Sequence, residues 1–242
     1  MIDFNTIHFD ELDSTNTKCK ELAKEGYPHG TVVIAACQTA GKGRLGRSFC
    51  SPNGTGLYCT LLIREGFDMN SAGLITPCAA VAAAKAIEEV SEQDAAIKWV
   101  NDIFMGGKKI CGILTEASLP KYAVIGIGIN LRSIKELFPQ NLHSVATSIE
   151  EQNGKIVSPD MMEKVLLKHL SYELEGLADR KFMSEYKKRS FLIGKNVNVH
   201  CGNDVYSALV TGIDDNAGLE LMLNDGQKKT LTAGEVSVRV KK

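Results

Sequence analysis

The sequence lacks any apolar run approaching the ~20 residues that a membrane-spanning helix needs. Its N-terminal segment carries early acidic residues and no apolar core, which argues against a signal peptide. The seven cysteines are odd in number and never form a C-x-x-C pair, and the five histidines show no H-x-x-x-H spacing. We therefore expect no membrane association, no disulfide framework and no built-in zinc site, and reduced thiols predict a cytoplasmic protein.

An excess of charge of either sign is also absent. The 28 Lys and Arg residues stand against 29 Asp and Glu residues, which gives a net charge of −1. Because nucleic-acid-binding domains are usually strongly basic, neither DNA nor RNA is an expected partner. A length of 242 residues and a hydrophobic content of 44% are those of a globular protein with one sizeable core and room for a small second domain.

One local absence is more informative than the overall composition. Between Gly26 and Arg64 there is no Asp or Glu, and this window contains the segment GKGRLGR at 41–47. A flexible, acid-free loop with three cations is suited to holding an anion. The pattern favours a phosphate, or a carboxylate that is being converted to a phosphate ester.

Three known glycine-rich loops share part of this pattern. The segment is close to a P-loop, with Arg47 where lysine is required, and Gly41, Gly43 and Gly46 also fit the dinucleotide fingerprint. Both of those loops need a helix directly after the glycines, whereas a turn at 51–56 and then a strand follow here. A protein kinase places its glycine loop between strands, but the sequence has no H-R-D or D-F-G. A solvated surface loop remains the alternative at this point.

Helices and strands are both expected in the first part of the chain. A helix is predicted from Ser14 or Thr15, either of which is a suitable cap, to about Glu25, with Gly26 as its stop. Residues 132–147 are expected to form a loop-rich connection. The other predicted strands lie at 31–37, 56–64, 95–99, 103–105, 109–116 and 122–131, and the other helices at 71–90, 159–179 and 181–190.

The pattern changes from Ile193 onward. Five short strands alternate there with turns at 202–204, 216–218 and 225–226. Short strands separated by tight turns predict a small β-barrel. We therefore expect two domains, at 1–190 and 191–242, in an α+β protein.

Several polar motifs follow the basic loop in order. They are KWVND at 98–102, KKICGIL at 108–114 and GIGINL at 126–131. Together with DSTN at 13–16 and Gln38, these segments resemble the biotin protein ligases, which attach biotin to a lysine of a carrier domain. The family's loop is G-R-G-R-x-G-R, its second motif K-W-P-N-D, its third K-[LIV]-x-G-I-L and its fourth G-[IA]-G-[IL]-N. The resemblance covers essentially the whole chain.

The sequence departs from the family pattern at two positions. Lys42 stands where the family has its first loop arginine, and Val100 stands where it has proline. Lysine keeps the charge but not the bidentate fork of arginine. A contribution through the backbone N–H of Lys42 would be unaffected.

The resemblance implies both a fold and a reaction. The fold is a mixed β-sheet catalytic domain flanked by helices, similar to class II aminoacyl-tRNA synthetases and lipoate ligases, followed by a small SH3-like β-barrel. The reaction is the ATP- and Mg²⁺-dependent activation of biotin to biotinyl-5′-AMP, followed by transfer to a lysine of a biotin carboxyl carrier domain. Related enzymes are often homodimers, which leaves a homodimer open.

The same resemblance assigns three catalytic residues. Arg44 is expected to bind phosphate, and Lys109 the biotin carboxylate and the bridging phosphate oxygen. Asp102 has three possible roles, which are binding Mg²⁺, accepting the proton of the incoming amine, or orienting a loop. For Lys109, a solvated position beside Lys108 in the hairpin is the alternative.

Biotin and nucleotide contacts are assigned in the same way. Ser14, Thr15 and Gln38 are expected at the ureido ring, Trp99 as a pocket wall, and two asparagines at the adenine edge. The full set comprises Ser14, Thr15, Asn16, Gln38, Gly41, Lys42, Gly43, Arg47, Trp99, Asn101, Gly112, Gly126, Ile129 and Asn130. Trp99 is alternatively a core anchor, and Asn130 a turn residue at the end of a strand. Gly126 and Gly128 weaken a strand, and a flat ligand against the sheet is the expected reason.

Other functions remain as alternatives. Lipoate ligases and octanoyltransferases share the implied fold, and some use a cysteine, which draws attention to Cys111. That cysteine lies within a predicted strand with no neighbouring histidine, so a small buried residue is expected instead. A biotin-sensing repressor needs a helix-turn-helix domain before the DSTN segment, where only 12 residues stand. A binding module without catalysis would not need Arg44, Arg47 and Lys109 together.

Overall fold

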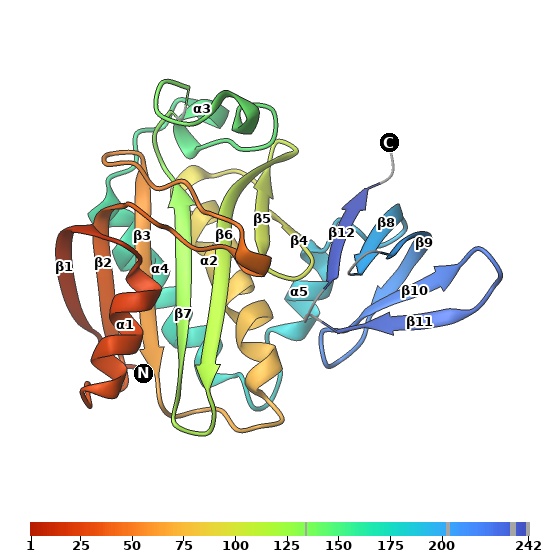
Figure 1. Cartoon of the computed structure of the whole chain (residues 1–242), viewed down its shortest axis with the longest axis horizontal. Coiled ribbons are helices and arrows are strands. Elements are labelled where there is room, and N and C mark those ends of the chain that lie inside the picture. The colour runs from red at the N-terminus through yellow and green to blue at the C-terminus, as the bar shows by residue number, and fades with distance from the viewer. Residues whose placement is uncertain (134, 202–203, 233–235, 241–242) are drawn as a thin grey trace.

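The computed structural model describes residues 1–133, 135–201, 204–232 and 236–240. Its larger sheet has seven strands, which are β1 (Asn5–Leu12), β2 (Thr31–Gln38), β3 (Gly56–Ile63), β4 (Ala96–Lys98), β5 (Asp102–Met105), β6 (Lys108–Ser118) and β7 (Tyr122–Asn130). The strand order is β1-β2-β3-β7-β6-β5-β4, and β1 with β2 is the parallel pair among otherwise antiparallel neighbours. The mixed sheet of the predicted α+β fold is confirmed (Figure 1).

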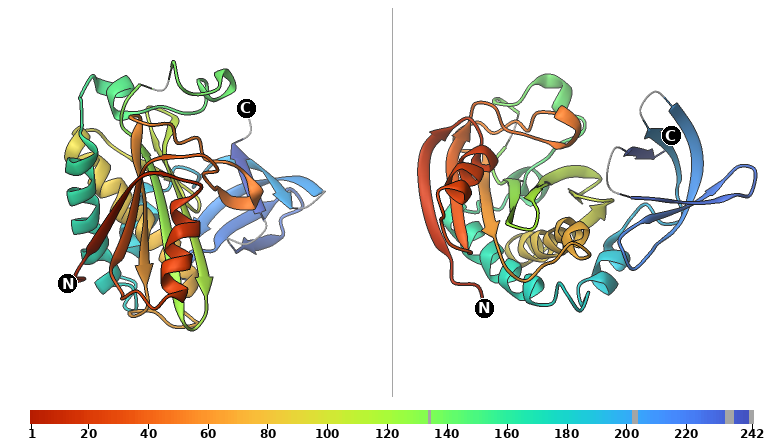
Figure 2. Two further views of the ribbon diagram at one scale, coloured as in Figure 1. Left: turned by 60° about the vertical axis from the view of Figure 1, so that its left-hand side comes forward. Right: turned by 60° about the horizontal axis from the view of Figure 1, so that its bottom comes forward.

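Five α-helices accompany this sheet in the described residues. They are α1 (Thr15–Lys24), α2 (Ile75–Ser91), α3 (Ile149–Asn153), α4 (Pro159–Glu175) and α5 (Met183–Arg189). Helices α2 and α4 pack together and cover one face of the sheet, while α1 lies on the other face against β2, β3 and β7 (Figure 2). None of the helices described combines the length and the apolar character needed to cross a membrane.

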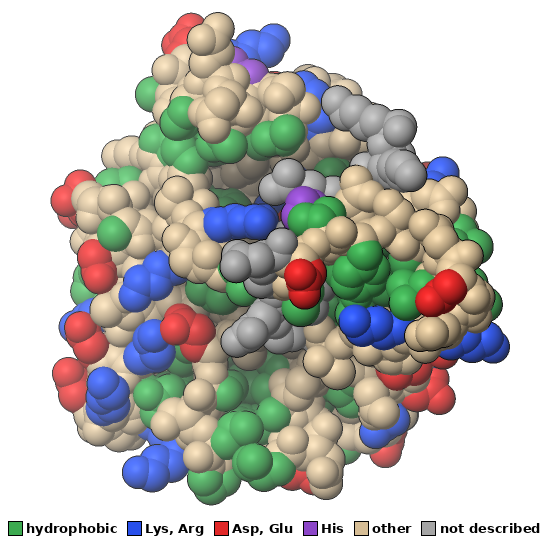
Figure 3. All heavy atoms as spheres, turned by 45° about the vertical axis from the view of Figure 1, so that its right-hand side comes forward, with side chains coloured by type: hydrophobic (Ala, Val, Ile, Leu, Met, Phe, Trp, Pro, Cys, Tyr) green, Lys and Arg blue, Asp and Glu red, His purple; other side chains and the backbone are tan. Residues whose placement is uncertain are grey.

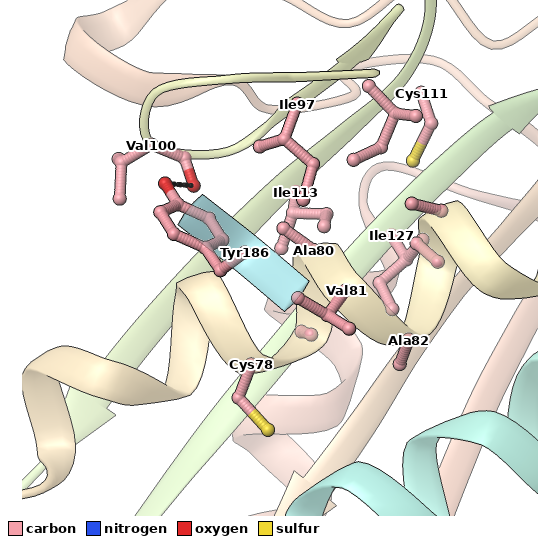
Figure 4. Close-up of a cluster of buried hydrophobic side chains, with 14 of the residues drawn as sticks. Cys78, Ala80, Val81, Ala82, Ile97, Val100, Cys111, Ile113, Ile127 and Tyr186 are labelled. Carbon is pink, nitrogen blue, oxygen red and sulfur yellow. Dashed lines mark hydrogen bonds between the residues drawn. The ribbon is translucent and has the colours of Figure 1, made fainter. Parts of the chain in front are cut away.

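The main core lies between the sheet and helix α2. Alanine favours helix formation, and its small side chain lets the helix approach the strands closely. Residues 79–84 of α2 are all fully buried. They pack with isoleucines of the strands, among them Ile97, Ile113 and Ile127 (Figure 4). The alanine-rich segment predicted as a helix therefore forms the main support of the sheet.

The second sheet follows α5 in the chain. It is antiparallel, with the order β11-β10-β9-β8-β12. Its strands are β8 (Asn196–Cys201), β9 (Asp204–Ile213), β10 (Leu219–Leu223), β11 (Lys228–Leu231) and β12 (Val236–Val240). The predicted separate all-β module is confirmed, although the predicted turn at 202–204 lies partly outside the described residues.

Among the strands and α-helices described, two were not predicted. Strand β1 lies at the edge of the large sheet, and its mixed polar sequence is half exposed, so it gives no clear apolar pattern. Helix α3 has only five residues, too few to show a period. Helix α4 also ends at Glu175 rather than at 179, because Gly176 follows as its C-cap.

One turn of the second sheet contacts the large sheet through hydrogen bonds. The turn between β9 and β10 is closed by Asp214, whose carboxylate accepts from the backbone N–H groups of Asn216 and Gly218 at 2.8 and 2.7 Å. The carbonyl of Ala217 in this turn accepts from the indole N–H of Trp99 at 2.8 Å. Asp215 also pairs with Lys187 of α5 at 2.6 Å. The second sheet is thereby fixed to the segment that carries the KWVND motif.

Helix α5 supports the same segment from the core side. The hydroxyl of the fully buried Tyr186 donates to the carbonyl of Val100 at 3.1 Å (Figure 4). Burial raises the pKa of Tyr186, so its hydroxyl keeps its proton and remains a donor. The connection between β4 and β5 is thus held by Tyr186 from one element and by Ala217 from another.

Removing the Tyr186 hydroxyl should destabilise the protein without removing side-chain volume. We predict that Tyr186→Phe lowers the free energy of unfolding by about 1–3 kcal/mol, because the buried Val100 carbonyl loses its donor. Urea denaturation measures the difference. The control is Tyr172→Phe, since Tyr172 is 71% exposed and its change should stay within about 0.5 kcal/mol. Equal effects of both variants would contradict the supporting role of Tyr186.

Candidate active site

The predicted site residues surround two adjoining cavities on the face of the large sheet that carries α1. The basic loop leaves β2, crosses in front of β7 and β6, and covers them (Figure 1). Side chains of even-numbered positions in β7 face this side, since alternate residues of a strand point to opposite faces. The first cavity is lined by Ser14, Thr15, Asn16, Gln38, Lys42, Gly43, Arg44, Phe49, Asn101, Lys109, Gly112, Ile113, Leu114, Gly126, Ile127 and Gly128.

Away from the second cavity, Ser14, Thr15 and Gln38 supply uncharged polar groups to the wall of the first cavity, and Lys42 also lines it there. The side-chain oxygen of Gln38 accepts from the Thr15 backbone N–H at 2.9 Å and lies 3.1 Å from the Thr15 hydroxyl. Its amide nitrogen donates to the buried Ser51 at 2.8 Å. Ser14 is the N-cap of α1 by position, but its hydroxyl makes no capping hydrogen bond. The cap role considered for Ser14 therefore does not engage its hydroxyl, which lies at the cavity wall.

The end of the first cavity that adjoins the second carries Arg44 and Lys109, and Asp102 lines the second cavity. Lys109 forms an ion pair with Asp102 at 2.7 Å, and both side chains are about one-third to one-quarter exposed, at 31% and 25%. Arg44 donates to the side-chain oxygen of Asn101 at 3.0 Å. Burial lowers the pKa of Arg44, and the nearby Asp102 carboxylate opposes that shift. Fixed positive charge therefore faces this end of the cavity.

Asn101 connects the loop to the sheet. Its side-chain nitrogen donates to the Ile113 carbonyl at 2.9 Å, and its backbone carbonyl accepts from the Ile113 N–H at 3.0 Å. Both ends of its amide are thus engaged, one by β6 and one by Arg44. An adenine contact by this amide would require Arg44 to move, and the geometry instead favours a role in holding that arginine.

The second cavity extends from the cationic end. Its volume is about 120 Å³, and it is lined by Gly43, Arg44, Leu45, Arg47, Ser48, Phe49, Lys98, Trp99, Asn101, Asp102 and Lys109. Arg47 and Trp99, both predicted for the nucleotide or biotin, therefore lie here. Trp99 is only 5% exposed and is bonded to Ala217, so the wall and anchor roles coincide in one side chain.

Phe49 was missed in the sequence analysis, although it lies at the centre of the site. Its ring packs on Gly128 so closely that a Cβ at that glycine would overlap it, and a Cβ at Gly112 would also touch it. The Lys109 ammonium lies 5.8 Å from the ring centre. A flat ligand was expected against the glycines of β7, but in this structure the ring of Phe49 lies against Gly128. The sequence signal that could have identified Phe49 is an apolar residue directly after a polar loop.

Comparison with known proteins identifies the family. Residues 8–130 match the model of the biotin/lipoate A/B protein ligase family, and residues 192–239 match the biotin protein ligase C terminal domain. The bifunctional ligase/repressor BirA of Bacillus subtilis is 35% identical over 236 residues, which is 94% of this chain and 72% of that protein. The chain belongs to the biotin protein ligase family.

Two further relatives agree with this assignment. The biotin--[acetyl-CoA-carboxylase] ligase of Mycobacterium tuberculosis is 28% identical over 239 residues, covering 93% of this chain and 86% of that one. The solved biotin protein ligase of Aquifex aeolicus, in complex with biotin and ATP, superposes with a TM-score of 0.84 at 28% identity. That match covers 98% of this chain and 99% of the other. The ligase fold therefore extends over both sheets.

Close packing explains why glycine occupies two positions of the biotin protein ligase motifs in this chain. A Cβ at Gly126 would overlap the amide oxygen of Asn16, and one at Gly41 would overlap the Phe49 carbonyl. Gly43 donates its N–H to the Arg47 carbonyl at 2.7 Å, which closes the loop on itself. The ammonium of Lys42 donates to the Thr17 hydroxyl at 2.7 Å. In this ligase, Lys42 therefore directs its charge toward α1.

Three predicted ligand residues, Gly41, Ile129 and Asn130, line neither cavity. Ile129 was expected to contact a ligand, but its side chain is fully buried in the core, because odd-numbered residues of β7 face the helices. Asn130 lies on the site face, is 4% exposed and donates to the Thr147 carbonyl at 2.9 Å. Its side-chain oxygen is buried and has no hydrogen-bond partner among the described residues.

Cys111 does not suit thiol chemistry in this ligase. It is fully buried, and burial raises the pKa of its thiol. A thiol must ionise to act as a nucleophile. The geometry therefore gives no support to a cysteine-dependent acyl transfer at this position.

Proposed function

We propose that this ligase activates biotin with ATP to biotinyl-5′-AMP and transfers biotin to a lysine of a biotin carboxyl carrier domain. The observation that carries the proposal is one cavity whose wall has uncharged hydrogen-bonding groups at Thr15 and Gln38 and two cations, Arg44 and Lys109, where it adjoins the second cavity. Biotin has the matching polarity, since it has a ureido ring at one end and a carboxylate at the other. The Aquifex relative is described in complex with biotin and ATP, which supports the same pair of substrates.

The first step joins biotin to AMP. A carboxylate oxygen of biotin attacks the α-phosphorus of ATP, and the bond to the bridging oxygen breaks so that pyrophosphate leaves. Both reactants are anions, and negative charge increases on the phosphate oxygens as the bond forms. Arg44 and Lys109 are placed to hold these oxygens, and each charge-assisted hydrogen bond contributes about 1.5–3 kcal/mol.

The second step transfers biotin to the carrier. The lysine amine attacks the carbonyl carbon of the mixed anhydride, a tetrahedral intermediate forms and collapses, and AMP leaves. The amine must lose a proton in this step. Asp102 contacts Lys109 at 2.7 Å, so in the proposed mechanism it first orients that lysine and then accepts the proton when the carrier amine arrives.

Mg²⁺ would enter the site bound to the phosphates of ATP. Mg²⁺ is usually held by phosphate oxygens, water and one or two carboxylates, where it neutralises charge on the phosphates. Asp102 supplies one carboxylate of that kind, and no cluster of three metal-ligating side chains occurs in the described part of the chain. The carboxylate therefore fits a nucleotide-bound ion better than a resident one.

Biotin entry requires the loop to move. The first cavity has a volume of about 50 Å³, far below the roughly 300–1,000 Å³ of ordinary ligand pockets. The ring of Phe49 occupies the space over Gly128 and Gly112. We propose that Phe49 leaves these glycines when biotin enters and that the loop then closes over the adenylate, which shields the anhydride from water.

The remaining partners stay predictions. An accepting carrier domain, a homodimer and a cytoplasmic location follow from the family resemblance. On the face shown in Figure 3, acidic and basic side chains are interspersed rather than gathered by sign. That pattern fits the net charge of −1 and the expectation of no nucleic-acid partner.

Isotope exchange tests the proposed function. With biotin and Mg²⁺, the protein should exchange labelled pyrophosphate into ATP, because adenylate formation is reversible and needs no carrier. Lipoate and octanoate serve as matched acids that lack the ureido ring. Exchange that depends on lipoate or octanoate and not on biotin would overturn the assignment.

Replacing Lys109 should reduce the rate of adenylation while the fold persists. We expect Lys109→Ala to lower biotin-dependent exchange by about a hundredfold or more, comparable to the loss of one oxyanion donor. The control is Lys121→Ala, which removes an exposed lysine from the β6–β7 turn and should have no effect. If Lys109→Ala turns over at nearly the parental rate, Lys109 is a solvated hairpin residue without a catalytic role.

Replacing Arg44 tests the closing of the loop. Arg44→Gly removes the hydrogen bond to Asn101 that ties the loop across the cavity. We expect this variant still to form the adenylate but to release it early, so that biotin becomes attached to bystander proteins in the same tube. Rapid gel filtration measures the retained adenylate. Equal retention by variant and parent would exclude the closing role of Arg44.

A further inference from the structure

The basic loop is closed by hydrogen bonds between its two halves. The N–H of Gly43 donates to the Arg47 carbonyl at 2.7 Å, and the N–H of Phe49, just after the loop, donates to the Gly41 carbonyl at 2.8 Å. A loop closed in this way moves as one unit. Its position over the cavities therefore depends on its contacts with the rest of the protein.

Two of these contacts join the loop to the large sheet, and the mechanism above already uses both. Arg44 donates to Asn101, which is itself bonded to β6, and the Phe49 ring packs on Gly128 of β7. Neither of these two contacts involves helix α1. With them alone, the side of the loop that faces α1 would be free to lift away from the cavity.

A third contact joins the loop to α1, and the mechanism does not use it. The ammonium of Lys42 lies 2.7 Å from the hydroxyl of Thr17. Because an ammonium can only donate, the Thr17 oxygen is the acceptor. Lys42 also lines the first cavity beside Ser14, Thr15 and Asn16, so its side chain reaches from the loop to the helix along the cavity wall. Helix α1 packs on β2, β3 and β7, which makes it a firm support.

The charge of Glu116 draws the Lys42 ammonium toward α1. Glu116 lies in β6 and accepts from the amide nitrogen of Asn16 at 2.9 Å and from the ammonium of Lys20 at 2.6 Å. Burial raises the pKa of the Glu116 carboxyl, but these hydrogen bonds and the charges of Lys20 and Lys42 bring the pKa below its usual range. The carboxylate is therefore ionised and attracts the ammonium of Lys42.

We infer that Thr17 is a positioning residue, whose hydroxyl holds Lys42 and so keeps the α1 side of the basic loop closed over bound biotinyl-5′-AMP. The inference rests on the proposed function and adds a residue that retains the intermediate until the carrier arrives. Thr17 lines neither cavity. Its hydroxyl should therefore affect how long the adenylate stays in the site and not how fast it forms.

Release of the adenylate from Thr17→Val tests the inference. Valine has the shape of threonine without the hydroxyl, and its helix propensity is similar. Each protein forms the adenylate from labelled biotin, ATP and Mg²⁺ without a carrier, rapid gel filtration removes free ligands, and release is followed over time. We expect release about three- to tenfold faster than from the parent, the range of one solvent-exposed hydrogen bond to a charged group. Pyrophosphate exchange at saturating biotin and ATP should stay within about twofold, because Thr17 contacts no reacting group.

Two further substitutions test whether the hydroxyl and the ammonium act through one bond. Thr17→Ser keeps the hydroxyl, so its release rate should equal that of the parent. Lys42→Met removes the donor, so it should release the adenylate as fast as Thr17→Val, and the double variant should release it no faster than either single variant. Thermal melts check folding, and Lys42→Met, which leaves α1 unchanged, carries the test if Thr17→Val does not melt cooperatively.

The outcomes separate this inference from the proposed function. A parent without biotin-dependent exchange overturns both. If the parent exchanges, a parental release rate in Thr17→Val or fast release from Thr17→Ser overturns the role of the Thr17 hydroxyl alone, as does a parent that retains no adenylate. Additive effects of Thr17→Val and Lys42→Met would show that the two residues act separately and would also overturn it. Slower exchange in Thr17→Val with unchanged release would place Thr17 in the chemistry, against the inference.

Discussion

The hydrogen bond from Arg44 to Asn101 joins the two parts of the site that the chain must bring together. Arg44 belongs to a loop with little regular structure, whereas Asn101 is bonded through both backbone and side chain to β6. This hydrogen bond therefore joins the basic loop to the rigid sheet. Behind Asn101, Tyr186 and Ala217 hold the neighbouring residues Val100 and Trp99. Helix α5 and the second sheet thus support the position of a loop cation.

The large elements and the set of site motifs were predictable, because each rests on local information. Alternating or continuous apolar residues identified β2, β3 and β7, and the alanine-rich segment identified α2. The motifs GKGRLGR, KWVND and GIGINL have characteristic spacings, so their order indicated the family before any contact was known. The comparisons then confirmed the family over both sheets.

The features of the site that were not predicted depend on contacts between residues far apart in the chain. Phe49 has no motif of its own, and its position on Gly128 follows only from the folding of the loop over β7. Ile129 belongs to a motif, but the alternation of the strand turns it to the core. Glu116 is separated by 100 residues from Asn16, so their hydrogen bond gives no signal in the sequence. Spacing identifies which residues matter, whereas the structure shows which atoms they engage.

The central claim is that biotin lies between the hydrogen-bonding groups of Thr15 and Gln38 and the cations Arg44 and Lys109. A crystal structure of the protein with bound biotin tests it most directly. The account predicts the ureido ring at Thr15 and Gln38, the carboxylate within hydrogen-bond distance of Lys109, and the Phe49 ring displaced from Gly128. Biotin bound in the reverse direction, or bound elsewhere with Phe49 still on Gly128, would contradict the account.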